Sequence, residues 1–550
     1  MFSEGFMRKY IFWILLLFSY PPLHCQSNLP RLDELSIEEK VGQLLMVHFY
    51  GTEANGDAKK LIQDFHIGGI IYYEWANGLA DAQQVQILSR GLQSLAQERA
   101  HPIPLFLAID QEGGVVNRLK NGFTQFPGNY ALGQIKKAGD AEACAYATGL
   151  ELKSVGINVN LAPVVDVNCN EKNPIIGIRA FGSSPKDVAS LGKEMMEGFR
   201  KSSILSVLKH FPGHGDVEVD SHQALPCLNK TRGELDQVEL YPFHQLLPLS
   251  EAVMTSHLFV PALDAKTCIT FSCDAVTQVL RKEMGFEGVI LTDSLAMQGC
   301  LGQSQGVVDA AIQSFKAGHD VLLLGGKQLL GEGGGFEITI DEIAKIHQTL
   351  VFLVQTGEIS EQRLDASVRR ILAAKKIYAC QDLALSFDPS IHQQLAQKVA
   401  DTATEVKYCQ LQEKVSLKTQ RILLVSPSIC QEAIEKSDLV HLAPLTTRYF
   451  YDSLSPEKEA FDAGVALAAR SDLCVFCTYN AWRYPQQVTF VEALIKEGLP
   501  VIVVAGRDPW DQTLFSKASI VICTYSPVCC SFNSAAHLIR QEYQCATTNP

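Results

Sequence analysis

The stretch GVILTDSLAM, residues 288–297, contains the pattern that decides the fold. Residues 289–292 form a short apolar run with β-branched side chains, which is typical of a buried strand, and Asp293 follows directly. Six further runs of this kind lie at 69–73, 105–109, 159–162, 205–208, 252–255 and 320–324. Segments with helical periodicity lie between them, for example 81–99, 185–200 and 274–283. This alternation predicts parallel strands joined by crossover helices.

Polar residues follow these runs at their carboxyl ends. Asp110, Lys209 with His210, and Asp293 each come directly after an apolar run, and His257 follows the run 252–255 after one serine. Strand ends converge on one mouth in a TIM barrel, which is where such barrels build active sites. We therefore predict an α/β fold with a TIM (β/α)8-type barrel, in which seven strands are placed and the eighth is not located.

The chain divides into a barrel and a smaller domain. The barrel is expected at 30–380, with 364–378 as its closing helix, and a linker and connecting helix at 381–415. Four more apolar runs, at 422–428, 473–479, 501–506 and 520–525, alternate with helical segments. They predict a C-terminal open-sheet α/β domain at 416–550.

The first 25 residues have the pattern of a signal peptide. Arg8 and Lys9 precede the apolar run 11–18, which is too short to span a bilayer. We expect export to the periplasm or the exterior and no membrane span in the mature chain. Cys25 raises lipid anchoring as an alternative, although residues 22–24 depart from the small-residue pattern that lipidation requires.

Charge and cysteine content narrow the classes of molecule that the protein could bind. A net charge of -13 argues against nucleic acid, which attracts basic surfaces. The 16 cysteines are scattered, and Cys474 and Cys477 form a CxxC inside an apolar run, so we expect buried thiols and no metal. The oligomeric state stays open.

The segment 209–222, KHFPGHGDVEVDSH, is the richest in chemically active residues. Pro212 and two glycines exclude a helix, so His210 and His214 need not converge on a metal. In an extended backbone, Asp220 and His222 point the same way, and a carboxylate that accepts a ring N–H would prepare His222 for proton transfer.

This segment resembles the signature of glycoside hydrolase family 3, in its β-N-acetylglucosaminidase (NagZ-type) branch. Further similar segments are EEKVGQLLMVHFYG at 38–51, AIDQEGGVVNRL at 108–119, NLAPVVDVN at 160–168, NPIIGIRAFG at 173–182, MTSHLFVPALD at 254–264 and GFEGVILTDSLAMQG at 285–299. The similarity runs in order from about residue 35 to residue 378, with a weaker match at 501–511 in the second domain.

The resemblance implies specific roles. Asp293 corresponds to the nucleophile, and His222 with Asp220 to the acid/base pair. The residues implied to bind N-acetylglucosamine are Asp110, Arg118, Arg179, Lys209 and His210. Two positions depart from the family pattern, Val115 after the EGG triplet and Ser294 after the nucleophile.

The implied activity is exo-acting, retaining hydrolysis of terminal β-linked N-acetylglucosamine, with muropeptides from peptidoglycan as the expected substrate and no cofactor. Three alternatives remain: substrate assistance by the acetamide, a glycoside phosphorylase that releases N-acetylglucosamine-1-phosphate, and an inactive wall-binding protein. A histidine acid/base, unlike a carboxylate, would not repel phosphate.

Overall fold

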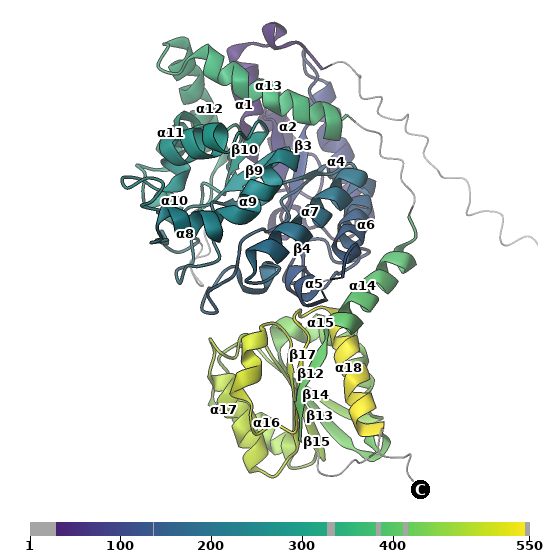
Figure 1. The fold of residues 1–550 in the computed structure, drawn as a ribbon. Coiled ribbons are helices and arrows are strands. Elements are labelled where there is room, and N and C mark those ends of the chain that lie inside the picture. Colours follow the sequence, from purple (N-terminus) through teal and green to yellow (C-terminus); the bar gives the residue numbers. More distant parts are fainter. Residues whose placement is uncertain (1–28, 136, 327–335, 381–386, 411–415, 545–550) are drawn as a thin grey trace, which may run out of the picture.

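The computed structural model describes residues 29–544 apart from 136, 327–335, 381–386 and 411–415, and Figure 1 shows two bodies joined by a helix. The expected signal peptide, residues 1–25, and Cys25 lie outside the described residues. None of the described helices is long and apolar enough to cross a membrane.

The first body is a barrel of short parallel strands. Its strands are β1 Leu45–Val47, β2 Gly69–Ile71, β3 Phe106–Ile109, β6 Val159–Asn160, β7 Leu205–Ser206, β8 Leu208–Phe211, β9 Ala252–Thr255, β10 Val289–Thr292 and β11 Leu322–Leu323. Only Val207 separates β7 from β8, so these two strands share one of eight positions. A hairpin, β4 Gln111–Gly113 with β5 Val116–Asn117, follows β3.

Three pairings close the barrel. β11 pairs in parallel with β1, and a bridge between Leu291 and Val321 joins β10 to β11. A second bridge, from Val164 to Lys209, ties the segment after β6 to β8. The predicted barrel is confirmed, and the strand that the sequence analysis did not locate is β1, between β11 and β2.

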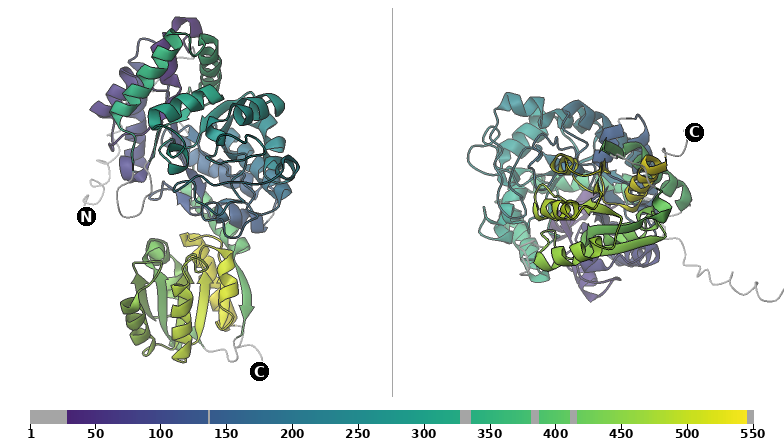
Figure 2. Two further views of the ribbon diagram at one scale, coloured as in Figure 1. Left: turned by 90° about the vertical axis from the view of Figure 1, so that its left-hand side faces the viewer. Right: turned by 90° about the horizontal axis from the view of Figure 1, so that it is seen from below.

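Helices surround the barrel, as Figure 2 shows from two further directions. They are α1 Ile37–Gln43, α2 Gly56–Gln63, α4 Ala82–Gln97, α5 Asn129–Ile135, α6 Asp140–Ser154, α7 Pro185–Lys201, α8 Arg232–Gln237, α9 Leu240–Leu246, the π-helix Asp274–Glu283, α11 Val307–Ala317, α12 Ile340–Gln355 and α13 Glu361–Tyr378, with the short turns α3 Glu74–Asn77 and α10 Gln298–Leu301.

Local sequence sets where these helices begin and how they attach. Ser184 caps α7 by accepting from the Asp187 amide, and Pro185 occupies the first turn, where its missing N–H costs nothing. On α13, Lys375 is fully buried and donates to Gln43 Oε1 and Gly68 O, both at 2.7 Å. A buried amine needs such partners, and they fasten the closing helix to the barrel.

The second body is an open sheet with strand order β12-β17-β16-β15-β13-β14. Its strands are β12 Glu405–Cys409, β13 Arg421–Pro427, β14 Leu445–Tyr451, β15 Leu473–Thr478, β16 Val501–Ala505 and β17 Ile520–Cys523, and only β12 is antiparallel to its neighbour. α16 Lys458–Ala468 and α17 Gln486–Lys496 cover one face, with α15 Gln431–Glu435 and α18 Cys529–Gln544 on the other (Figure 1). The predicted open-sheet domain is therefore present.

Two edge strands differ from the sequence-based expectation. β12 falls in the segment 381–415 that we assigned to the linker, yet it pairs with β17 and belongs to the second sheet, so the boundary at 416 is wrong. β14 was not predicted at all. Both strands mix exposed and half-buried residues, and Tyr451 is the one buried residue in them, so neither has the continuous apolar run that marks a buried parallel strand.

The connecting helix α14, Pro389–Ala403, packs against both bodies. His392 Nδ1 lies 2.7 Å from Glu151 Oε1 on α6, and Gln397 Nε2 donates to Ser534 Oγ on α18. Residues from both bodies also form one apolar cluster: Ala131, Ala403, Ala505, Cys523 and Tyr525. The carboxyl ends of the second sheet therefore face the barrel.

The described cysteines are all free. Cys474 and Cys477 are fully buried and lie in separate apolar clusters on opposite faces of the sheet. Because residues three apart on a strand point to opposite faces, this CxxC cannot chelate a metal, and burial raises the pKa of both thiols.

Candidate active site

Side chains at the carboxyl ends of the barrel strands form one charged cluster. Lys209, inside β8, contacts Asp110 Oδ1 and Glu112 Oε1, both at 2.7 Å. Arg179, on a loop after β6, grips both oxygens of Glu112 at 2.9 Å. Glu112, which was not predicted, thus bridges two of the predicted sugar-binding residues, Arg179 and Lys209, and the third, Asp110, joins them through Lys209.

Glu112 is nearly sealed from solvent, with a 2% exposed side chain. Burial alone would raise the pKa of this carboxyl, but the charges of Arg179 and Lys209 lower it far below its ordinary value. Lys209 and Arg179 both pair with the buried Glu112, and Asp110 is the partly exposed carboxylate at the edge of the cluster. The cluster therefore offers fixed cationic donors and one accessible acceptor, a set suited to sugar hydroxyls and an acetamide oxygen.

His210 joins this cluster through a second buried carboxylate. Its Nδ1 lies 2.6 Å from Asp166 Oδ2, and its backbone N–H donates to Asp166 Oδ1 at 3.1 Å. An Nη2 of Arg179 approaches His210 Nε2 at 3.4 Å. Asp166 is fully buried, and no role was predicted for it. Its place in the motif NLAPVVDVN is the signal that could have found it.

Asp293 follows β10 at the same mouth and is partly exposed. Burial would raise its pKa, but His257, His210, His222 and the Ser294 N–H, which donates to Oδ1 at 2.7 Å, lower it to about 2. The carboxylate is therefore ionised throughout the physiological range, which a carboxylate nucleophile requires.

The Asp220–His222 pair forms as predicted, but by a different geometry. His222 Nδ1 lies 2.8 Å from Asp220 Oδ1, and the same oxygen accepts the His222 N–H at 2.9 Å. The backbone here is a turn rather than extended, so the expectation of alternating side chains is wrong, and the aspartate instead folds the chain back on itself. Burial would raise the pKa of Asp220, and its hydrogen bond with His222 lowers it, so the pair is an oriented imidazole beside a carboxylate.

Arg118 lies on the loop after β5, and its backbone N–H donates to Gln111 Oε1 at 2.9 Å. Tyr73, after β2, is close enough to Asp110, Arg118 and Asp293 for their charges to shift its pKa, which burial raises most. The hydrogen bond to Gln111, which directly follows Asp110, holds the backbone of the predicted Arg118 beside this end of β3. Tyr73 was not predicted, and its position at a strand end was the one signal that could have found it.

Other candidate positions are structural. His257 is fully buried, with Nδ1 on Thr270 Oγ1 and Nε2 on Ser294 O. A second acidic group, Cys169 with Asp216 and Glu239, has the spacing of metal ligands. Lys230 lies 2.6 Å from Asp216 and 2.5 Å from Glu239, so an ammonium already supplies the positive charge there.

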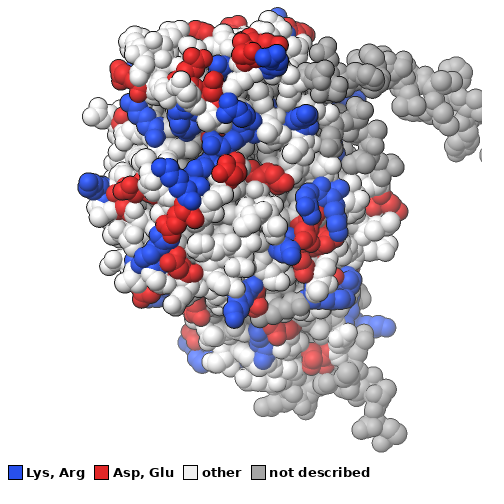
Figure 3. All heavy atoms as spheres, turned by 45° about the horizontal axis from the view of Figure 1, so that its top comes forward, with Lys and Arg blue, Asp and Glu red and all other residues white. Residues whose placement is uncertain are grey.

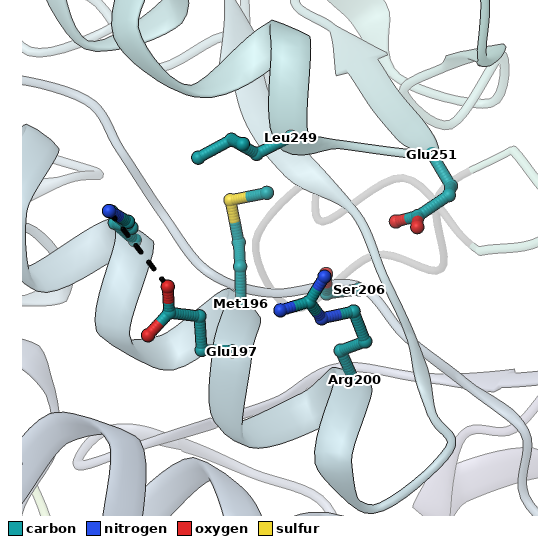
Figure 4. A pocket seen from close by; sticks show the side chains of 7 residues that line it. Met196, Glu197, Arg200, Ser206, Leu249 and Glu251 are labelled. Carbon is teal, nitrogen blue, oxygen red and sulfur yellow. Dashed lines mark ion pairs between the residues drawn. The ribbon is translucent and has the colours of Figure 1, made fainter.

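A small pocket opens at the other end of the barrel strands (Figure 4). It is lined by Lys193, Met196, Glu197 and Arg200 of α7 and by Ser206, Leu249 and Glu251. Ser206 lies near the start of the segment formed by β7 and β8, and Glu251 directly precedes β9, so this pocket is separate from the predicted site at the carboxyl ends. On the face shown in Figure 3, acidic and basic side chains are interspersed.

Comparisons with known proteins agree with this architecture. Residues 36–374 match the glycosyl hydrolase family 3 N-terminal domain. β-Hexosaminidase A of Pseudoalteromonas piscicida is 36% identical over 419 residues, which are 68% of this chain and 67% of that protein. A β-hexosaminidase of Idiomarina loihiensis is 33% identical over 285 residues, covering 51% of this chain and 83% of that protein.

A solved structure extends the similarity to the second domain. The family 3 β-N-acetylglucosaminidase of Paenibacillus sp. strain FPU-7 superposes with a TM-score of 0.82 at 32% identity, covering 92% of this chain and 97% of that one. The family match spans more than half of the chain, and the named relatives are the hexosaminidases that the motifs predicted. The chain belongs to glycoside hydrolase family 3 and is a glycoside hydrolase.

Proposed function

We propose that this enzyme is an exo-acting, retaining β-N-acetylglucosaminidase. The observation that carries the proposal is that an ionised carboxylate, Asp293, and an oriented imidazole, His222, lie on neighbouring segments, which a 3.0 Å hydrogen bond from the Gly299 N–H to Ser221 O joins. Similarity to proteins named β-hexosaminidase and β-N-acetylglucosaminidase supports the choice of sugar.

In the first step, Asp293 attacks the anomeric carbon while His222 protonates the leaving oxygen. The glycosidic bond breaks as an ester forms between the sugar and the carboxylate. Asp220 holds Nδ1 of the imidazole, which leaves Nε2 to exchange the proton.

In the second step, water attacks the anomeric carbon, His222 accepts its proton, and the ester bond to Asp293 breaks. Two inversions leave the product with the configuration of the substrate. A positioned acid/base contributes about 10²–10⁴-fold to the rate of each step.

The charged cluster supplies the sugar contacts. We assign Asp110, Arg118, Arg179, Lys209 and His210 to the hydroxyls and acetamide of the terminal N-acetylglucosamine. Salt bridges fix the cations before substrate arrives, so little rotamer entropy is lost on binding. The distribution of donors suits a neutral sugar better than an anion, because Glu112 and Asp110 already balance Lys209 and Arg179.

We further propose muropeptides from peptidoglycan as the natural substrate and export as the route to them. Residues 8–18 support export through their basic and apolar character. Membrane fractionation and mass determination of the mature N-terminus would distinguish cleavage, lipidation at Cys25 and retention of the segment.

A panel of nitrophenyl glycosides tests the activity. We expect release of nitrophenol from the β-N-acetylglucosaminide and at least about 10²-fold less from the β-glucoside, since the acetamide contacts would go unmade. The pH dependence of kcat/KM should have a limb that His222→Asn abolishes. Equal rates on both sugars, or sugar-1-phosphate as the main product in phosphate buffer, would contradict the proposal.

A further inference from the structure

The acid/base pair sits on a segment that has little structure of its own. Between the end of β8 at Phe211 and the start of α8 at Arg232 there is no helix among these described residues, and one bridge, Cys227 to Phe259, is the only strand pairing. Proton transfer needs donor and acceptor atoms about 2.6–3.2 Å apart. Contacts from elsewhere in the fold must therefore set where His222 stands.

Ser221, between Asp220 and His222, provides those contacts. It is 3% exposed, its Oγ lies 3.0 Å from His214 Nε2, and its carbonyl accepts the Gly299 N–H at 3.0 Å. Ser221, which carries no catalytic group, is thus held from both sides. Its neighbours Asp220 and His222 remain partly exposed.

Gly299 ties this segment to the nucleophile. It lies on α10, directly after the loop that begins at Asp293. A side chain at this position would come within 2.8 Å of Ser221 O and 3.1 Å of Ala224 O, so only glycine permits the approach without a shift of the backbone. The spacing between the nucleophile segment and the acid/base segment is set at this contact.

His214 is fastened in turn to the sugar site. Asp166 Oδ1 accepts the His214 N–H at 2.7 Å and the His210 N–H at 3.1 Å, and Oδ2 holds the His210 ring. Asn173 Nδ2 also donates to His214 O at 2.8 Å. One buried carboxylate therefore fixes both the proposed sugar-binding histidine and the start of the acid/base segment.

His214 itself is not suited to catalysis. It is 3% exposed, and burial lowers its pKa to about 4, so the ring is neutral at the pH where the enzyme would work. A neutral, enclosed ring can hold a hydroxyl without exchanging protons with solvent. Its single ring contact of this kind is with Ser221 Oγ, among the hydrogen bonds of the described residues.

We infer that His214 and Ser221 are positioning residues for the acid/base. The chain of hydrogen bonds from Asp166 through His214 to Ser221, closed by Gly299, places His222 against the leaving oxygen while Asp293 attacks from the other side. This inference rests on the proposed function, in which His222 transfers the proton.

The test separates proton delivery from every other effect by its dependence on the leaving group. A dinitrophenyl glycoside leaves without a proton, whereas a phenyl glycoside requires one. A misplacement near 1 Å costs about 10²-fold. We expect Ser221→Ala to lower kcat/KM for the phenyl N-acetylglucosaminide about tenfold to 10²-fold, and for the dinitrophenyl substrate less than about threefold.

A matched control is available at the carboxyl end of α7, where Ser202 is the capping residue. Ser202 is 2% exposed and donates to Phe199 O at 2.9 Å, so Ser202→Ala removes an equally buried hydroxyl far from the site. It should lower the melting temperature as Ser221→Ala does and leave the ratio of the two rates unchanged. Gly299→Ala approaches the same segment from the other side and should reproduce the selective loss.

The outcomes are distinct. The inference would be overturned if Ser221→Ala lost kcat/KM equally on the two substrates or lost none. Where Ser221→Ala does not fold, the ratio of the two rates in Gly299→Ala decides instead. His222→Asn is measured alongside. If His222→Asn slows both substrates equally, the proposed function fails. If His222→Asn slows the phenyl substrate selectively but Ser221→Ala and Gly299→Ala do not, only the positioning role fails.

Discussion

Asp293 in the barrel and Asp511 in the second domain stand in similar places with opposite electrostatics. Each follows the carboxyl end of a parallel strand, after β10 and in the turn Pro509–Leu514 after β16. The pKa of Asp293 falls to about 2, whereas that of Asp511 rises to about 7. Burial pushes both upward, so the neighbours decide the outcome.

The groups that surround the two aspartates differ in the sign of their charge. Histidines and a backbone N–H surround Asp293, while Asp511 faces a second buried carboxylate, Asp508, and its hydrogen bonds with Thr478 and Trp482 only partly offset burial. Asp508 and Asp511 are 1% and 0% exposed, whereas Asp293 reaches the barrel mouth. A carboxylate at the carboxyl end of a parallel strand is thus not sufficient for an active site. The groups around it must also stabilise its charge, and it must be reachable from solvent.

The largest effect should come from exchanging the two aspartates for asparagine one at a time. Asp293→Asn should lower kcat/KM for the nitrophenyl N-acetylglucosaminide by more than about 10⁴-fold, because no group would form the ester. Asp511→Asn should keep the wild-type rate. Activity of Asp293→Asn within tenfold of wild type would remove the distinction between the two sites.

His222→Asn should follow, with a loss of about 10²–10⁴-fold on the phenyl glycoside and far less on the dinitrophenyl glycoside. Asparagine retains hydrogen bonding and packing but cannot transfer a proton. Rates for both substrates, measured at saturation and below KM, separate this role from binding. A loss that is independent of the leaving group would assign His222 to the sugar instead.

Glu112→Gln tests the charged cluster. Removal of the carboxylate leaves Lys209 and Arg179 short of a counter-charge, which should cost about 3 kcal/mol of unfolding free energy and raise KM about tenfold. The control is Glu151→Gln, which removes a similarly buried carboxylate from the pair with His392 at the domain interface. This variant should lose stability and keep its KM; a raised KM in both would mean that the effect is not local to the site.

The smallest effect concerns stability and pH. The folded pKa of Asp511, about 7, lies above its unfolded value near 4, so between these pH values the native state holds a proton that the unfolded chain has released. Stability should therefore fall as pH rises through this window, by at most about 4 kcal/mol. Urea unfolding of the wild type and Asp511→Asn, followed by tryptophan fluorescence, should show a slope that the variant lacks. Parallel pH profiles would mean that Asp511 is ionised in the folded protein.

The sequence predicted most of the barrel because its central strands are continuous apolar runs. It missed β1, whose three residues merge with the flanking helix and polar segment, and the exposed edge strands β12 and β14. Edge strands bury one side at most and lose the apolar signal. Pairing alone reveals them, and pairing depends on residues far apart in the chain.

The candidate site was predicted through its motifs, and the structure brings Asp110, Arg179, Lys209 and His210 into one hydrogen-bonded group. The residues that hold this group together were missed. Glu112 looks like an ordinary polar residue of a short hairpin, and Asp166 like one of a loop, until Lys209 and His210, about a hundred and about forty residues further along the chain, are placed beside them. Tertiary pairing of this kind has no local pattern to find.

Trapping the intermediate tests the central claim most directly. A fluorinated N-acetylglucosaminyl fluoride should inactivate the enzyme with a stoichiometric gain of one sugar mass, and peptide mapping should place the sugar on Asp293. Label on any other carboxylate, or turnover that releases an oxazoline with no protein adduct, would contradict a covalent nucleophile at the end of β10.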